Sequence, residues 1–93
     1  MIRLVQKRTG GRVFEAELPL SLEQFERCRK IVKPIVERTM KDEPLISGLA
    51  LSIGNEALKQ VPGLPKLDGL DTNILVHMCI GKRVTVEEIG GEL

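Results

Sequence analysis

The feature that most constrains the fold is a run of alternating apolar residues, interrupted by two glycines near the N-terminus. In residues 2–18, IRLVQKRTGGRVFEAEL, apolar side chains recur at alternate positions on both sides of Thr9-Gly10-Gly11. Successive side chains of a strand point to opposite faces, and either glycine adopts a positive φ without steric penalty. The segment therefore predicts a β-hairpin with one buried face and one solvent-exposed face.

The second arm of this hairpin carries two carboxylates on one face. Glu15 and Glu17 alternate with Phe14 and Ala16. A pair of carboxylates can bind a divalent cation, but we expect both groups to face solvent because Phe14 and Ala16 face the core. The hairpin therefore predicts no metal site.

An amphipathic helix is predicted after Pro19, which ends the hairpin. Ser21 and Gln24 have the spacing of a capping box, in which each side chain pairs with a backbone N–H group at the helix start. Apolar residues then recur every three or four positions, at Leu22, Phe25, Cys28, Val32, Ile35 and Val36. Because a proline inside a helix removes a backbone hydrogen bond, we expect a kink near residue 30, or an end there and a restart at Pro34.

The middle of the chain does not distinguish helix from strand. Residues 45–53 fit both periodicities, whereas residues 55–61 favour a helix. Residues 61–71 hold two prolines and two glycines, which predicts a loop. We expect this loop to be anchored to the core by Leu64, Leu67 and Leu70.

The segment 73–80 leaves two alternatives open. It is either a short buried helix, capped by Asp71 or Thr72 and closed by Gly81, or a strand. In the second case Gly81-Lys82 is a two-residue turn that joins strands 74–80 and 83–89 into a C-terminal hairpin. Thr85 between two valines favours a strand for the last segment in either case.

These elements predict an α+β fold and a single domain, residues 1–93. The length excludes a barrel or a doubly wound nucleotide-binding fold, which need about 200 residues or more. A hydrophobic content of 42% with a net charge of +1 is unlike a disordered chain. The longest uncharged stretch, from Pro44 to Asn55, is shorter than the roughly 20 residues of a membrane span. With no signal-peptide pattern at the N-terminus, we expect a cytoplasmic protein without a membrane partner.

Catalytic and metal-binding patterns are weak. His77 is the single histidine and lies in an apolar segment, a setting more typical of a hydrogen-bonded core or groove-wall residue than of a general base. Cys28 and Cys79 are too few for a disulfide framework, and we expect reduced thiols. Together with His77 they lack the spacing of a structural zinc site. The sequence therefore predicts no catalytic residue, no cofactor and no metal.

Clustered basic residues are the clearest functional signal, and they make nucleic acid a candidate partner. Three lie near the hairpin tip and four on the predicted helix: Lys7, Arg8, Arg12, Arg27, Arg29, Lys30 and Lys33. Against this interpretation stand interleaved acidic residues on the helix and an aromatic content of 2%, which leaves little for base stacking.

The leading hypothesis is a non-catalytic binding or assembly module that forms a homo-oligomer. Its aliphatic residues exceed what one small core needs, and a short chain leaves sheet edges that can pair with another copy. The alternative is a small nucleic-acid-binding regulator that uses the basic residues above. A small enzyme using His77 or the Glu15/Glu17 pair is the least favoured hypothesis.

Overall fold

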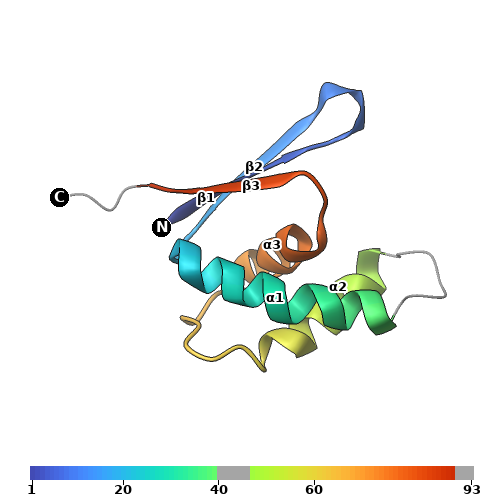
Figure 1. Ribbon diagram of the computed structural model, residues 1–93, viewed down its shortest axis with the longest axis vertical. Helices are drawn as coiled ribbons and strands as arrows, with labels where there is room; N and C mark the ends of the chain where they lie inside the picture. The colour runs from blue at the N-terminus through green and yellow to red at the C-terminus, as the bar shows by residue number, and fades with distance from the viewer. Residues whose placement is uncertain (40–46, 90–93) are drawn as a thin grey trace.

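The computed structural model describes residues 1–39 and 47–89, and it confirms the α+β class. A three-stranded antiparallel sheet lies against three helices (Figure 1). The elements in chain order are β1 (Ile2–Lys7), a short 3-10 turn (Thr9–Gly11), β2 (Val13–Leu18), α1 (Leu22–Thr39), α2 (Ser47–Leu58), α3 (Gly69–Ile80) and β3 (Val84–Glu88). No helix within the described ranges is long and apolar enough to cross a membrane.

The predicted hairpin is present as strands β1 and β2. Its register pairs Ile2 with Leu18 and Lys7 with Val13, and both turn glycines have positive φ, 81° at Gly10 and 80° at Gly11. Strand β3 pairs antiparallel with the other side of β1, which gives the order β2-β1-β3. Strands β2 and β3 are therefore the edges of the sheet. The central strand β1 pairs with both the neighbouring strand of the hairpin and the last strand described.

Helix α1 begins with the predicted capping box. Ser21 Oγ accepts a hydrogen bond from the backbone N–H of Gln24 at 3.1 Å, and Gln24 Oε1 accepts one from the N–H of Ser21 at 2.8 Å. The predicted restart at Pro34 is wrong, because one helix of 18 residues runs through this proline. Pro34 and Lys30 are both exposed, so water can hydrate the Lys30 carbonyl that the proline leaves without an N–H partner.

Helix α2 settles the ambiguous middle segment. Residues 47–58 are helical, so the strand alternative is wrong for 47–53, whereas residues 45–46 lie outside the described residues. The helix predicted for 55–61 ends at Leu58 and continues as a turn. Neither periodicity dominates in the sequence. The packing of α2 against both α1 and α3 therefore decides that this segment is a helix.

Segment 73–80 belongs to helix α3, so the alternative of a C-terminal hairpin is wrong. Asp68, rather than Asp71 or Thr72, is the N-cap: its carboxylate accepts a hydrogen bond from the Asp71 N–H at 2.7 Å. The loop consequently ends three residues earlier than predicted. Gly81 closes the helix as expected, and its N–H donates to the His77 carbonyl at 3.0 Å.

Two of the three loop leucines are anchored as predicted. Leu64 and Leu67 are partly buried and pack against the core. The prediction is wrong for Leu70, whose residue is 69% exposed. This leucine lies in the first turn of α3 rather than in the loop, on a side of the helix that faces solvent.

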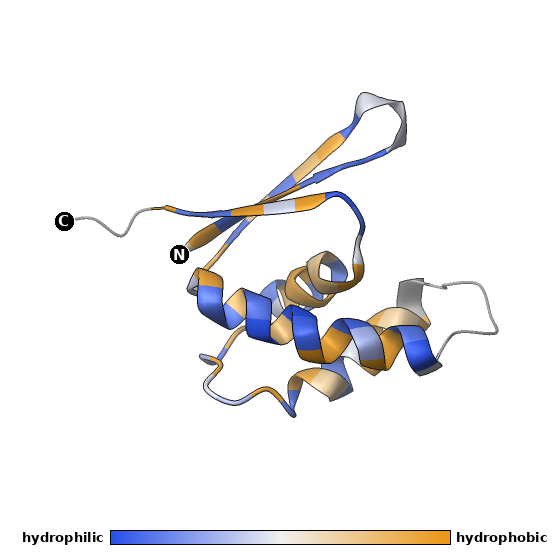
Figure 2. Cartoon of the chain, viewed as in Figure 1, coloured by the Kyte–Doolittle hydropathy of each residue, from blue (hydrophilic) through white to orange (hydrophobic). Residues whose placement is uncertain are grey.

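The core lies between the sheet and the helices. Apolar and polar residues alternate along the strands, and both kinds recur along the helices (Figure 2). The fully buried residues of the core include Ile2, Leu4, Leu18, Phe25, Cys28, Val32, Val36, Leu75, Val76, Met78 and Cys79. Both thiols are free, and burial raises the pKa of Cys28 to about 11 and also raises that of Cys79.

Gly54 sets the close approach of α2 to α3. A Cβ atom at this position would overlap the buried side chain of Val76, which is stiff because it is β-branched. Gly54→Ala should therefore lower the free energy of unfolding by about 1–3 kcal/mol, although alanine has the higher helix propensity. Urea denaturation of both proteins measures the difference.

Gly69→Ala is the matched control for this prediction. Gly69 also lies in a helix, but an added Cβ has no neighbour within 4 Å. We expect unchanged or slightly higher stability for this variant. Equal stability changes in the two variants would contradict the proposed contact between Gly54 and Val76.

Candidate nucleic-acid interface

The predicted basic residues form two separate groups. Lys7, Arg8 and Arg12 lie at the turn end of the hairpin, which projects away from the helices (Figure 1). The other predicted residues lie on α1. The structure thus keeps the two groups on different elements and does not join them into one surface.

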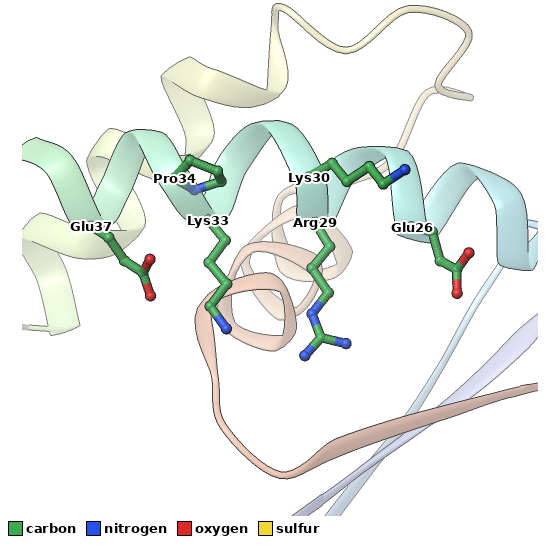
Figure 3. A pocket seen from close by; sticks show the side chains of 6 residues that line it. All are labelled: Glu26, Arg29, Lys30, Lys33, Pro34 and Glu37. Carbon is green, nitrogen blue, oxygen red and sulfur yellow. The ribbon is translucent and has the colours of Figure 1, made fainter.

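Three of the four predicted basic residues on α1 line a shallow groove of about 520 Å³ along the helix (Figure 3). Arg29, Lys30 and Lys33 line it beside Pro34. Two glutamates, Glu26 and Glu37, also line this groove and flank the basic side chains (Figure 3). Acidic and basic groups therefore nearly balance along the groove, which weakens its field for an anion.

Arg27 is separate from this groove. Its guanidinium donates to Glu23 Oε2 at 3.3 Å and to the Pro62 carbonyl at 3.4 Å. The contact with Pro62 ties α1 to the loop between α2 and α3, so Arg27 has a structural role in the fold. Among the predicted residues, it has the weakest case for contacting nucleic acid.

The hairpin group gains two basic residues from a distant part of the chain. The Lys7 N–H donates to the Arg83 carbonyl at 3.3 Å, and the Arg8 N–H donates to the Arg12 carbonyl at 2.7 Å. The turn between α3 and β3 therefore lies beside the end of β1. We use the name hairpin cluster for Lys7, Arg8, Arg12, Lys82 and Arg83.

Sequence reasoning missed Lys82 and Arg83 because no linear signal relates them to the hairpin. Their place follows from the pairing of Gln6 with Val84, which extends the ladder between β1 and β3 to the hairpin end. Arg83 also adopts a positive φ of 59°, rare for a residue with a side chain. The two residues thus reach the hairpin through a tight turn after α3.

Charge is distributed unevenly along the sheet. Within the described ranges, no member of the hairpin cluster forms a salt bridge. At the opposite end, Arg3 pairs with Glu17 at 3.5 Å and with Glu87 at 3.8 Å. Positive charge is therefore neutralised at one end of the sheet and left for solvent or a ligand at the other.

Arg8 is held by three neighbouring side chains. Its Nη2 lies 2.7 Å from His77 Nε2, and its Nε donates to Gln6 Oε1 at 3.2 Å. The guanidinium carbon lies 5.1 Å from the centre of the Phe14 ring, a cation–π distance. Because a guanidinium has donors only, His77 Nε2 must be the acceptor, and the neutral ring carries its proton on Nδ1.

Gln6 and Phe14 connect this arrangement to the rest of the fold. Gln6 is 9% exposed, and its Nε2 donates to the Lys82 carbonyl at 3.3 Å. The Phe14 ring packs edge-on against His77, with centroids 6.3 Å apart. The network thus links both arms of the hairpin to the C-terminal end of α3.

The environment of His77 favours its neutral form. Burial lowers the pKa of the imidazole, and the neighbouring Arg8 lowers it further. Both effects disfavour a positive charge on the ring. At neutral pH, His77 is therefore a hydrogen-bond acceptor for Arg8.

The other chemistry-bearing residues are divided between the core and the exposed face of the sheet. Cys28 and Cys79 lie in the core, while Glu15 and Glu17 are exposed on the sheet. Within the described residues, no three His, Cys, Asp or Glu side chains are grouped as metal ligands. The arrangement thus supports recognition of an anion by the hairpin cluster.

Comparisons with protein-family models, curated sequences and solved structures find no match for this chain.

Folding stability should decrease as the pH falls below about 6.5, the ordinary pKa of histidine. The folded chain has a lowered His77 pKa and so binds a proton more weakly than the unfolded chain does. The stabilisation is complete above that pH and is lost as the pH approaches the folded-state pKa. His77→Gln removes this titration.

Urea denaturation at about pH 7.5 and about pH 5.5 measures the effect in both proteins. The decrease in unfolding free energy should be larger in the wild type than in His77→Gln. Carboxylates titrate in both proteins and cancel in the comparison. An equal decrease would contradict a lowered pKa at His77.

Proposed function

We propose that this chain is a non-catalytic binding module that contacts the phosphate backbone of nucleic acid through the hairpin cluster. The observation that carries the proposal is the convergence of Lys82 and Arg83 on Lys7, Arg8 and Arg12, without salt bridges from the described residues. When clustered cations free of acidic partners neutralise phosphates, the counterions condensed on the nucleic acid are released, which favours binding.

The aromatic residues support backbone contacts over base stacking. Phe25 is fully buried in the core, and Phe14 is occupied by Arg8 on its face and His77 near its edge. The chain has no tryptophan or tyrosine. Proteins that bind unpaired bases depend on stacking platforms, so phosphate contacts should dominate here.

The proposal predicts strongly salt-dependent binding. Lys7→Ala, Arg12→Ala and Arg83→Ala combined should weaken binding to a labelled DNA duplex of about 20 base pairs by at least about tenfold near 50 mM salt. The slope of log affinity against log salt should become shallower by roughly 0.9 for each phosphate that the variant no longer neutralises. Fluorescence anisotropy measures both quantities.

A matched control removes the same charge elsewhere. Arg38, Lys59 and Lys66 are exposed and lie outside the hairpin cluster, so their combined alanine variant should retain the wild-type salt slope. Equal weakening by the two triple variants would show that net charge alone matters. No wild-type binding near 50 mM salt would refute the proposed function.

Self-association is a second proposal, supported by the two edges of the sheet. The outer sides of β2 and β3 have no partner strand within the described residues, and such edges can pair with another copy. Glu15 and Glu17 lie on one edge strand, and Glu87 and Glu88 on the other. Pairing like edges in antiparallel fashion would bring carboxylates together, which is unfavourable.

This second proposal predicts an opposite response to salt. Screening of the carboxylates should favour an edge-paired oligomer, whereas salt weakens phosphate binding. Light scattering should therefore give a mass above 10.3 kDa that rises with salt. A constant mass of one chain over a wide range of protein and salt concentrations would refute it.

A further inference from the structure

We propose that His77 is a positioning residue for Arg8, and that the neutral imidazole holds the guanidinium with one edge directed to a bound phosphate. This inference rests on the proposed function, because it names how one cation of the hairpin cluster is prepared for its ligand. It also assigns a role to the single histidine of the chain.

The hydrogen bonds of Arg8 leave a defined set of donors. Gln6 Oε1 accepts from Nε, and His77 Nε2 accepts from Nη2. Phe14 covers one face of the guanidinium. The remaining Nη2 hydrogen and the two Nη1 hydrogens are not used in these contacts, and Arg8 as a residue is exposed.

This remaining edge matches the geometry of a phosphate. Two parallel N–H groups of a guanidinium can donate to two phosphate oxygens at once. An unconstrained arginine loses considerable side-chain entropy on such binding, whereas Arg8 is already ordered by its three neighbours. It should therefore contribute more to affinity than an unconstrained cation of the same cluster.

Protonation of His77 removes the acceptor that holds Arg8. The proton occupies Nε2, the ring becomes a cation, and it then faces the guanidinium at hydrogen-bond distance. Within one helical turn of His77, the residues Asn73, Ile74, Ile80 and the C-cap Gly81 are uncharged.

Helix α1 contributes charges of both signs. It packs against α3, and Figure 3 shows Glu26, Arg29, Lys33 and Glu37 directed to the same side of the helix. The charge in direct contact with the ring is the Arg8 guanidinium, so a protonated His77 faces this cation. Repulsion should release Arg8 from its docked position.

The first measurement needs no nucleic acid. An NMR titration of the imidazole C–H signals gives the His77 pKa in the wild type and in Arg8→Gln. The pKa should rise in Arg8→Gln, because a neighbouring cation is removed. Arg12→Gln, which removes a cation that has no hydrogen bond to the ring, should leave it unchanged.

The second measurement isolates the contribution of Arg8 to binding. The ratio of Kd for Arg8→Gln to Kd for the wild type is measured on the same DNA duplex, one pH unit above and one below the measured His77 pKa. Above the His77 pKa, we expect the Kd of Arg8→Gln to be about tenfold that of the wild type, which is typical of a charge-assisted hydrogen bond. Below the His77 pKa, we expect a ratio of about twofold. The higher pH is set from the His77 pKa of Arg8→Gln and the lower pH from that of the wild type, so that His77 has the same charge in both proteins and its contribution cancels in the ratio.

His77→Gln provides the matched background, because its amide oxygen can accept from Arg8 but does not titrate. In that background the ratio should be the same at both pH values. An unchanged His77 pKa in Arg8→Gln would overturn the proposal. So would a ratio of Kd for Arg8→Gln to Kd for the wild type that does not change with pH when His77 is present. Both results are obtained without substituting His77. A raised pKa without any wild-type binding at either pH would instead refute the proposed function, and the phosphate role of Arg8 with it.

Discussion

The pairing of β3 with β1 is the constraint on which the rest of the structure depends. It places the last described strand beside the first, in a register that joins Ile2 to Glu88 and Gln6 to Val84. Residues at opposite ends of the chain thereby become neighbours, and the helices between them must pack on one side of the sheet (Figure 1). The hairpin is a local structure, but its position relative to α3 is set by this long-range pairing.

The candidate interface is a direct consequence of this topology. Because β3 follows α3 after a short turn, the C-terminal end of α3 reaches the hairpin where Arg8 leaves β1. Gln6 bonds the turn, and His77 bonds Arg8. The same pairing thus produces both the cluster of cations and the network that orders one of them. The phosphate contact and the pH dependence that we propose would therefore both depend on this one site.

The sequence predicted the parts of the fold that depend on neighbouring residues. The hairpin follows from alternation around Gly10 and Gly11, and the start of α1 follows from the reciprocal bonds of Ser21 and Gln24. Local signals failed in α3, where Leu75, Val76, Met78 and Cys79 are all buried. A segment enclosed on several sides is apolar on several sides, so its periodicity does not separate helix from strand.

For the site, the sequence by itself determined that basic residues gather at Lys7, Arg8 and Arg12, since they are close in the chain and flank a turn. The tertiary structure alone decided that Lys82 and Arg83 join them and that Arg8 meets His77. It also decided that the α1 cations Arg29, Lys30 and Lys33 lie apart. The physical reason is that spacing along the chain encodes local turns and helix faces, whereas strand pairing across some 80 residues depends on burial of the whole core.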